Sequence, residues 1–371
     1  MSDQRIHSER IERVVVRGAN WVGDAVMTVP ALRELRRALP GAHITLAMRA
    51  WAVGVFDGAD FLDEVMILDS ERRGLRGRLS EVREWRRRRF DLAVLFPNAF
   101  APALVAWAAR VPRRIGYDTE RRGTLLTHAL HVPDWRGKRH EVFYYLNIIA
   151  KIERSMGGES SPAPAPLAGA DLPAPRLNLE ISFERRQAAR EILMQHGVLF
   201  DRPLVALCPG STNSRAKRWP PERFAALADQ LIDDAGAGVV LIGSREEMDV
   251  TAEVVGHMTR RPVVLTGKTS LAETIAVLSH ADLLITNDTG PAHIAAALNL
   301  PTLVIFGPTD PTTTRPFSAS AEVIRRPPEC APCMLRVCPI DHRCMTAITP
   351  AEVYARARQI VGERVSVGAA R

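Results

Sequence analysis

The feature that most constrains the fold of this chain is a repeated alternation of short apolar runs with longer amphipathic helical patterns. In the first half, the strand-like runs are RVVVRG, HITLAMR, EVMILD and FDLAVLFPN. In the second half, they are RPLVALCPG, GVVLIGS, PVVLTG, DLLITND and PTLVIFG. Helical patterns separate them, for example from about Ala25 to Ala38 and from about Pro221 to Asp234. This rhythm predicts an α/β protein built on parallel sheets.

The alternation is interrupted once, by a stretch rich in Pro, Ala, Gly and Ser. This stretch, 157–178, has the composition of an extended linker. The chain has 371 residues, and a prior of roughly 150 residues per domain also predicts two domains. We therefore expect a first domain over 1–156 and a second over 179–371, with the last helix either in the second domain or returning to the first.

The charge of the chain limits the classes of partner. Lys and Arg number 49 against 42 Asp and Glu, a net charge of +7, which favours anionic partners. Much of the excess lies in the run ERRGLRGRLSEVREWRRRRF at 71–90, which fits either an anion-facing patch or a solvated helix surface. Only Trp85 and Phe90 place aromatic rings within this run, so nucleic acid is not expected as a partner.

Nothing in the sequence predicts a membrane span or an export signal. No apolar stretch approaches the roughly 20 residues that cross a bilayer. The N-terminal segment MSDQRIHSER is too polar for a signal peptide. We therefore expect a cytoplasmic protein.

The loop after the first apolar run, RGANWVGDAVMTVPAL at 17–32, holds a single carboxylate where nucleotide-binding units place glycines. A dinucleotide loop needs closely spaced glycines so that the backbone can contact pyrophosphate, and here only Gly18 and Gly23 are present. Asp24 stands instead among apolar neighbours at the start of a helical pattern. It is a candidate general base. The alternative is an N-cap of the helix that follows.

A loop in the second half combines two features of an anion site. The run DLLITND ends at Asp288, after which Thr289 and Gly290 turn the chain. A helical pattern follows, and it contains His293, a further hydrogen-bond donor. Because the first turn of a helix has free N–H groups and a positive dipole end, the loop predicts a phosphate site. The alternatives are that Asp288 or Thr289 only caps the helix and that His293 is a buried polar residue.

A second loop of this kind, CPGSTNSRAKRWP at 208–220, also follows a strand-like run and precedes a helical pattern. Gly210, Ser211 and Thr212 offer backbone and hydroxyl donors, and Lys217 and Arg218 offer cations. Together they form a candidate diphosphate clamp. The alternative is a polar loop with a basic tip.

The loop LIGSREEMD at 241–249 carries polar groups suited to a ribose. Ser244, Glu246 and Glu247 follow the second apolar run of this half, where an acidic residue commonly accepts ribose hydroxyls. The sequence does not decide between Glu246 and Glu247, and an acidic first helical turn is the alternative interpretation.

These segments together resemble a known family. NWVGDAVM, FPNAF, CPGSTNSRAKRWP, LTGKTS and TNDTGPAHIAAAL, in this order and spacing, are similar to the motifs of glycosyltransferase family 9. The similarity runs from about Arg13 to Arg358. It implies a GT-B fold, in which two Rossmann-like parallel-sheet domains face a cleft, with the acceptor bound mainly by the first domain and the donor mainly by the second.

The resemblance also implies roles for individual residues. Asp24 matches the family's catalytic base, and Lys217 matches the cation that faces the donor phosphates. Asp288 matches the carboxylate that receives hydroxyls of the transferred sugar. The implied donor-binding residues are Gly210, Ser211, Thr212, Ser244, Glu246, Glu247, Asp288, Thr289, Gly290 and His293, and the implied acceptor-binding residues are Asn20, Trp21 and Asn98.

The reaction that the resemblance implies is an inverting transfer of L-glycero-D-manno-heptose from ADP-heptose to the heptosylated Kdo-lipid A inner core of lipopolysaccharide. It implies no cofactor for catalysis, and the lipid-linked acceptor implies peripheral contact with the inner face of the cytoplasmic membrane. The alternatives are transfer of the preceding heptose, another GT-B sugar transferase or epimerase, and a nucleotide-sugar-binding protein without turnover.

Four of the five cysteines lie close together in the sequence. Cys330, Cys333, Cys338 and Cys344 follow a C-x2-C-x4-C-x5-C spacing, which resembles a metal site but lacks the paired C-x2-C knuckles of zinc modules. A structural zinc ion or iron–sulfur cluster and a loop of reduced thiols both fit this spacing.

Overall fold

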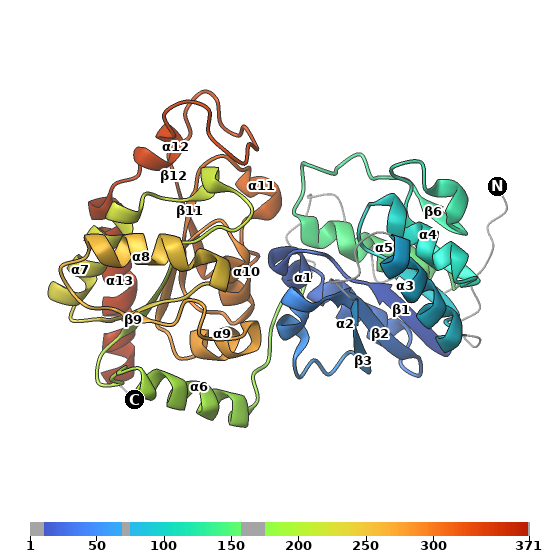
Figure 1. Ribbon diagram of the computed structural model, residues 1–371, viewed down its shortest axis with the longest axis horizontal. Coiled ribbons are helices and arrows are strands. Elements are labelled where there is room, and N and C mark those ends of the chain that lie inside the picture. The colour runs from blue at the N-terminus through green and yellow to red at the C-terminus, as the bar shows by residue number, and fades with distance from the viewer. Residues whose placement is uncertain (1–10, 69–74, 157–174, 370–371) are drawn as a thin grey trace. The chain divides into compact units, whose positions relative to one another are not determined.

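The computed structural model describes residues 11–68, 75–156 and 175–369. It divides the chain into two compact units, Met1–Leu177 and Asn178–Arg371. In each unit, the described residues form one layer of parallel strands with helices packed against it (Figure 1). The predicted α/β architecture with two parallel sheets is therefore confirmed.

In the first unit, a sheet of six parallel strands has the order β3-β2-β1-β4-β5-β6. The strands are β1 (Arg13–Arg17), β2 (His43–Arg49), β3 (Glu64–Leu68), β4 (Leu92–Leu95), β5 (Arg113–Tyr117) and β6 (His128–Leu130). The helices are α1 (Val22–Met27), α2 (Val29–Ala38), α3 (Leu75–Arg88), α4 (Phe100–Ala108) and α5 (Glu141–Ser155). The strand order reverses between β1 and β4, which pair directly. The loops after these two strands therefore lie at the switch point where α/β sheets bind ligands.

In the second unit, the sheet of six parallel strands has the order β12-β11-β10-β7-β8-β9. The strands are β7 (Leu204–Cys208), β8 (Gly238–Leu241), β9 (Val263–Val264), β10 (Leu283–Asn287), β11 (Thr302–Phe306) and β12 (Ala321–Arg325). The helices are α6 (Phe183–Gln195), α7 (Pro221–Asp233), α8 (Met248–His257), α9 (Leu271–Leu278), α10 (Gly290–Ala297), α11 (Pro311–Thr314), α12 (Arg343–Thr346) and α13 (Pro350–Ala369). Counted from β9, the order repeats that of the first sheet, with β7 and β10 at the switch point.

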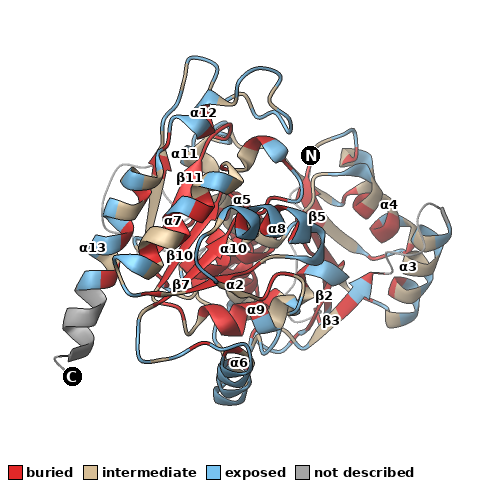
Figure 2. Ribbon diagram, turned by 60° about the vertical axis from the view of Figure 1, so that its left-hand side comes forward, coloured by how far each residue is buried: buried red, intermediate tan, exposed pale blue. Residues whose placement is uncertain are grey.

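The central strands are buried because they are apolar on both faces, as expected of parallel strands that helices cover. Val14, Val15 and Val16 in β1 are completely buried, and every residue of β10 is buried. Figure 2 shows the buried residues concentrated in the strands, with exposed residues on the outer sides of the helices. The core thus holds the sheets rigid, and their loops carry the polar side chains.

The single helix predicted from about Ala25 to Ala38 is two helices, α1 and α2, in the structure. The Thr28 hydroxyl donates to the Ala25 carbonyl over 2.7 Å where α1 ends, and Pro30 lies in the first turn of α2. A proline is tolerated in a first turn but not in a helix interior. The chain therefore starts a new helix at Val29.

The last helix, α13, packs within the second unit. Its buried residues Val353, Ala357 and Val361 share a hydrophobic cluster with Trp219 and Leu231. The predicted linker 157–178 lies outside the described residues up to position 174. Among the described helices, none combines the length and the apolar character that crossing a bilayer requires.

Candidate active site

Asp24 lies in the first turn of α1, at the switch point of the first sheet. The N-cap of α1 is Trp21, whose side chain makes no capping hydrogen bond, so Asp24 is inside the helix and the N-cap interpretation is wrong. The carboxylate is half-buried, and its Oδ1 accepts a hydrogen bond of 3.4 Å from the hydroxyl of Tyr145 on α5. The sequence did not single out Tyr145, because a tyrosine on an amphipathic helix has the pattern of a core residue.

The surroundings of Asp24 are poor in solvent and rich in ionisable groups. Burial, with a further contribution from the Asp24 carboxylate, raises the pKa of Tyr145 well above its usual value. Burial also raises the pKa of Glu141, where Arg136 opposes the shift and Asp24 adds to it. Glu141 and Tyr145 both lie on α5, so this helix lines the buried side of the candidate base. Tyr145 therefore remains a hydrogen-bond donor throughout the neutral pH range.

Asn20 and Trp21 precede α1 and are both exposed. The Asn20 side-chain oxygen accepts from Arg17 over 3.1 Å, and its carbonyl accepts from the Trp51 indole over 2.7 Å. Arg17 is buried beneath the loop, and desolvation lowers its pKa to about 10, although Glu81 opposes this shift. Arg17 thus fixes the loop through Asn20, and the Trp21 ring is exposed to solvent.

Asn98 follows β4, the other strand at the switch point of this sheet. Its side-chain amide lies 3.2 Å from the Tyr144 hydroxyl, which also accepts from Arg136 over 3.1 Å. The Arg136 guanidinium stands 4.3 Å above the Tyr144 ring, at the distance of a cation–π contact. Since Thr119 donates to the Asn98 carbonyl over 2.7 Å, both ends of this asparagine are fixed.

In the second unit, one buried asparagine ties two of the predicted loops together. The Asn287 side-chain nitrogen donates to the carbonyls of Pro209 and Gly210 over 2.8 and 3.2 Å. Its side-chain oxygen accepts from the Trp219 N–H over 3.0 Å. The two candidate anion loops, which follow the paired strands β7 and β10, are therefore adjacent, as predicted.

Lys217 and Asp288 meet where these loops come together. The Lys217 ammonium donates to Asp288 Oδ2 over 2.7 Å and to the Asp288 carbonyl over 3.2 Å. The same Oδ2 accepts from the Thr309 hydroxyl over 2.7 Å. The carboxylate side chain is 4% exposed and the lysine side chain 26%, so a buried acceptor holds a cation that still reaches solvent. Thr309, in the loop after β11, was not predicted because an isolated threonine carries no sequence signal.

The turn into α10 contains the predicted residues Asp288, Thr289 and Gly290. Thr289 is the N-cap of α10, and its side chain makes no capping hydrogen bond, while the Asp288 side chain faces Lys217 and Thr309. Neither residue therefore acts as the simple side-chain cap considered above. Gly290 begins the helix, and His293 is buried in its first turns. Lys217 thus contacts Asp288, which lies two residues before Gly290 at the start of α10.

The third predicted loop, 241–249, packs against the loop 208–220 at Gly210. The side chain of Glu247 is buried, its Oε2 accepts from the Ser244 N–H over 2.8 Å, and Glu246 is exposed. A Cβ atom on Gly210 would lie 2.3 Å from the Glu247 carboxyl group. Gly210 is therefore required by close packing, and Glu247 has a structural role under the loop. Glu246 and Ser244 are the exposed polar side chains there.

The remaining predicted residues of the 208–220 loop differ in exposure. Ser211 is buried, and its carbonyl accepts from two nitrogens of Arg218 over 3.2 and 3.1 Å, whereas Thr212 is exposed. The structure thus brings the predicted residues of the second unit to one sheet edge. Asp24, Asn20, Trp21 and Asn98 belong to the first unit.

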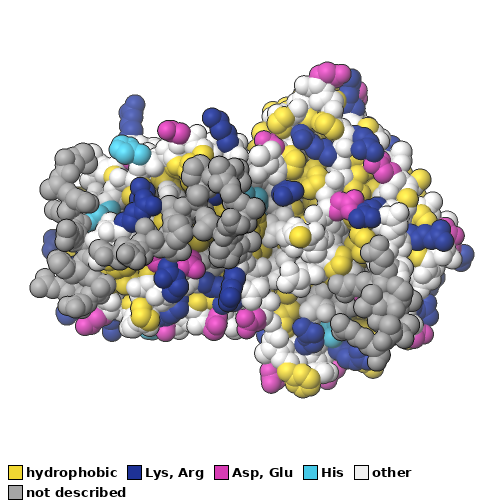
Figure 3. All heavy atoms as spheres, turned by 180° about the vertical axis from the view of Figure 1, so that it is seen from behind, with side chains coloured by type: hydrophobic (Ala, Val, Ile, Leu, Met, Phe, Trp, Pro, Cys, Tyr) yellow, Lys and Arg dark blue, Asp and Glu magenta, His cyan; other side chains and the backbone are white. Residues whose placement is uncertain are grey.

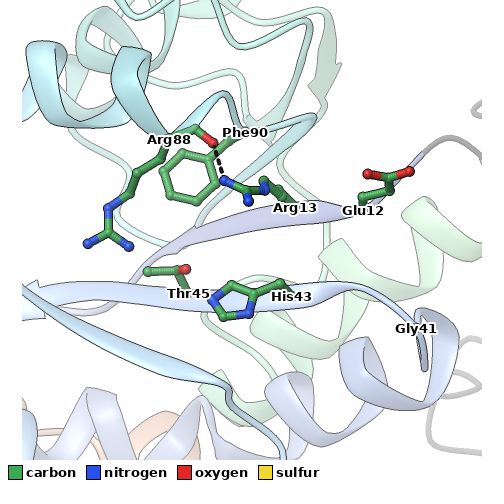
Figure 4. A pocket seen from close by; sticks show the side chains of 7 residues that line it. All are labelled: Glu12, Arg13, Gly41, His43, Thr45, Arg88 and Phe90. Carbon is green, nitrogen blue, oxygen red and sulfur yellow. Dashed lines mark hydrogen bonds between the residues drawn. The ribbon is translucent and has the colours of Figure 1, made fainter.

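A pocket in the first unit lies at the opposite edge of the sheet, where β1 and β2 begin (Figure 4). Within it, the Arg13 guanidinium donates to the Arg88 carbonyl over 3.0 Å. The residues that line it are Glu12, Arg13, Gly41, His43, Thr45, Arg88 and Phe90. It contains none of the predicted site residues and is separate from the Asp24 edge.

The described part of the arginine-rich run forms α3, and neighbouring carboxylates neutralise some of its charge. Arg87 and Arg88 pair with Glu84 over 2.7 and 2.6 Å, and Arg88 also pairs with Glu64. Hydrogen bonds from both arginines lower the pKa of Glu84 to about 2. On the face drawn in Figure 3, Lys and Arg side chains stand among Asp and Glu side chains. This part of the run has the character of a solvated helix surface.

For the four cysteines the sequence allowed either a metal site or a loop of reduced thiols. Among the described residues, no group of three or more His, Cys, Asp and Glu side chains is placed to hold a metal ion. Cys344 is buried in α12, whereas Cys330 is exposed on the preceding loop. Burial raises the pKa of Cys344, and the other three thiols add to the shift. All four are free thiols, as is the buried Cys208.

Comparisons with known proteins identify the family. The model of glycosyltransferase family 9 (heptosyltransferase) matches residues 78–343. The chain is 31% identical to lipopolysaccharide heptosyltransferase 2 of Escherichia coli over 331 residues, which cover 84% of this chain and 88% of the relative.

Solved structures agree with this assignment. The E. coli ADP-heptose lipopolysaccharide heptosyltransferase II superposes with a TM-score of 0.77 at 28% identity, covering 95% of this chain and 99% of that one. A family 9 glycosyltransferase from Veillonella parvula superposes with a TM-score of 0.78 at 25% identity, covering 98% and 100%. The predicted GT-B class and the predicted family resemblance are both confirmed. The chain therefore belongs to glycosyltransferase family 9, the heptosyltransferase family, and it is a glycosyltransferase.

Proposed function

We propose that this enzyme transfers L-glycero-D-manno-heptose from ADP-heptose, with inversion, to the heptosylated Kdo-lipid A inner core of lipopolysaccharide. The proposal is supported above all by the Lys217–Asp288–Thr309 cluster at the switch point of the second sheet. This cluster places a cation and a buried carboxylate beside a helix start, in a chain similar to lipopolysaccharide heptosyltransferase 2. The first unit then binds the acceptor, and the second binds the donor.

Asp24 acts as the general base in this reaction. It takes the proton of the acceptor hydroxyl while the hydroxyl oxygen forms a bond to the anomeric carbon of the heptose. The bond from that carbon to the β-phosphate oxygen breaks on the opposite face, and ADP leaves with the electron pair. The position of Asp24 in the first turn of α1, with one oxygen held by Tyr145, fixes a carboxylate for this task.

Lys217 and the N-terminus of α10 stabilise the negative charge that develops on ADP. The ammonium and the positive dipole end of α10, which begins at Gly290, lie at the same edge of the sheet. Asp288 receives hydroxyls of the heptose, and Thr309 fixes the orientation of its carboxylate. Thr289 and His293 complete the phosphate turn.

The nucleoside lies against the loops after β7 and β8. Ser244 and Glu246 are exposed there and accept or donate to the ribose hydroxyls, while Glu247 supports Gly210 from below. The exposed hydroxyl of Thr212 and the backbone of Ser211 face the diphosphate. Of the two acidic residues, Glu246 is thus the one that contacts the nucleoside.

The acceptor lies on Asn20, Trp21 and Asn98 in the first unit. The exposed Trp21 ring offers an apolar platform for a sugar face, and Asn20 and Asn98 offer hydrogen bonds. Arg136, which stacks on Tyr144 beside Asn98, supplies a cation for the anionic groups of the inner core.

The test of this function is a mass measurement. The enzyme is incubated with ADP-heptose and either Kdo-lipid A or its heptosylated form, and the product is weighed. We expect one added heptose on the heptosylated acceptor only. Gain of mass on the unheptosylated acceptor would show that the enzyme transfers the preceding heptose. Conversion of ADP-heptose without any acceptor would show that it is an epimerase.

The lipid-linked acceptor places the enzyme at the inner face of the cytoplasmic membrane. The net charge of +7 attracts it to anionic lipids through a force that salt screens. Sedimentation with vesicles of phosphatidylglycerol and phosphatidylethanolamine should decrease as salt rises. If vesicle binding did not change with salt concentration, the contact with the membrane would not be electrostatic.

No divalent metal is needed for catalysis in this proposal, because Lys217 and the α10 terminus supply the positive charge. Turnover measured with and without EDTA should be equal. A loss of activity on chelation that Mg²⁺ restores would show that these two groups are not sufficient.

A further inference from the structure

Tyr145 is the residue whose geometry goes furthest beyond the family assignment. Its side chain is buried under α1, its ring packs edge-on against Phe96 with centroids 5.3 Å apart, and its hydroxyl reaches Asp24 Oδ1 over 3.4 Å. A second ring, Tyr144, packs edge-on against it at 6.2 Å. The ring is thus fixed between aromatic neighbours, and the hydroxyl has a defined direction toward the candidate base.

We propose that Tyr145 is a positioning residue for the transfer reaction, which orients the Asp24 carboxylate and stabilises its charged form through a hydrogen bond from the protein interior. The proposal rests on the proposed role of Asp24. A carboxylate side chain has two rotatable torsions, and a fixed donor favours one orientation. The acceptor hydroxyl then meets a base that needs no reorganisation.

The charges around Asp24 decide the direction of the pH effect. On α5, Tyr145 donates to Asp24, and the half-buried Glu141 carries like charge when it ionises. Ahead of α5, Arg136 is the cation that acts on both Glu141 and Tyr145. The 3-10 turn Ala50–Phe56, which packs against α1, contains no ionisable side chain, and Arg49 precedes it.

The direction of the expected pH shift follows from the hydrogen bond that Tyr145 donates to Asp24. A hydrogen bond to the ionised form stabilises a carboxylate and lowers its pKa. Removing the Tyr145 hydroxyl therefore makes Asp24 easier to protonate. Since the base acts only when ionised, activity is lost at the acidic end first, and the acidic limb of the pH profile moves to higher pH.

The experiment uses Tyr145→Phe in the full-length enzyme, with kcat, donor KM and the pH profile of kcat/KM as readouts. We expect kcat at neutral pH to fall about tenfold, the donor KM to stay unchanged, and the acidic limb to move up by about one pH unit. Tyr117→Phe is the matched control. It removes another buried hydroxyl of the same unit, which donates to the Tyr144 carbonyl over 2.9 Å, and it should not move the limb.

Two results would overturn the inference. If Tyr145→Phe leaves kcat and the acidic limb unchanged, or moves the limb only as far as Tyr117→Phe does, then Tyr145 only fills the core. Failure of the proposed function is recognised separately: Asp24→Asn would then retain full turnover, whatever Tyr145→Phe does.

Discussion

The two units share one sheet topology but place different chemistry on it. In both, the first and fourth strands of the unit are neighbours, and most of the predicted residues follow these two strands. In the first unit these loops carry Asp24 and Asn98, and in the second they carry Lys217 and Asp288. The switch point of each sheet thus fixes where a site lies, while the loop side chains decide what it does.

The difference lies in how the charged group is held. Asp24 is half-buried, with an aromatic hydroxyl behind it. Lys217 is held by a buried carboxylate that is itself held by Thr309. The Asp24 carboxylate is therefore held through a neutral hydroxyl, whereas the Lys217 ammonium is held through an ion pair. The variants below test whether the two units divide base catalysis and donor stabilisation in this way.

The largest effect is expected for Asp24→Asn. Without a base, turnover should fall by about 10² to 10⁴, while the Kd for ADP measured by calorimetry stays unchanged because the donor residues lie in the second unit. Asp60→Asn, which removes an exposed carboxylate of the first unit, is the control. Full turnover in Asp24→Asn would show that Asp24 is not the catalytic base.

Lys217→Ala should lose about 10² to 10³ in kcat, because a preorganised cation for the leaving ADP is gone. The acceptor KM should change much less than kcat. Lys151→Ala, an exposed lysine on α5, controls for loss of one positive charge. Equal losses in the two variants would show that Lys217 acts only through net charge.

Gly210→Ala tests the packing of the donor loops. Its Cβ would overlap the buried Glu247 carboxyl group, so the loop must shift. We expect the donor KM to rise about tenfold with little change in acceptor KM. Gly256→Ala on α8, whose Cβ would meet nothing within 4 Å, should behave as wild type. A normal donor KM in Gly210→Ala would indicate that Glu247 can move aside.

Thr309→Val should have the smallest effect. It keeps the shape of the side chain but removes the hydrogen bond to Asp288, which is worth about 1 kcal/mol, so the donor KM should rise roughly fivefold. Thr302→Val removes a buried hydroxyl at the other end of β11, which donates to the Leu300 carbonyl. It should affect thermal stability but not donor KM. If Thr302→Val raised the donor KM and Thr309→Val changed only thermal stability, Thr309 would not be part of the donor site.

The fold was predictable wherever strands were apolar throughout. β1, β4, β7 and β10 were evident from runs such as Val14–Val16 and Leu283–Ile285. β5, β6 and β12 were not, because short strands toward the sheet edges tolerate charges and small residues, as in Arg113–Tyr117. Parallel edge strands depend on pairing with a neighbour, which a local pattern does not contain.

The site was predictable as far as its residues follow strands. Asp24, Lys217 and Asp288 follow apolar strand-like runs, where a charged residue is conspicuous in the sequence. Tyr145 contacts Asp24, and Thr309 contacts Asp288, from elements that lie elsewhere in the sequence. Their role depends on the direction of one side chain, which residue spacing does not specify. The sequence likewise did not show that Glu247 is buried and Glu246 exposed.

The strand order has a consequence for the synthesis of the chain on the ribosome. β7 gains β8 as a neighbour soon after it is made, but its other neighbour, β10, is translated only after α9. The same holds for β1, which waits for β4. During translation, each unit therefore passes through a stage in which its central strand is an open edge that invites pairing with another nascent chain. The strands exposed at this stage, β1 and β7, are those that Asp24 and Lys217 follow in the chain.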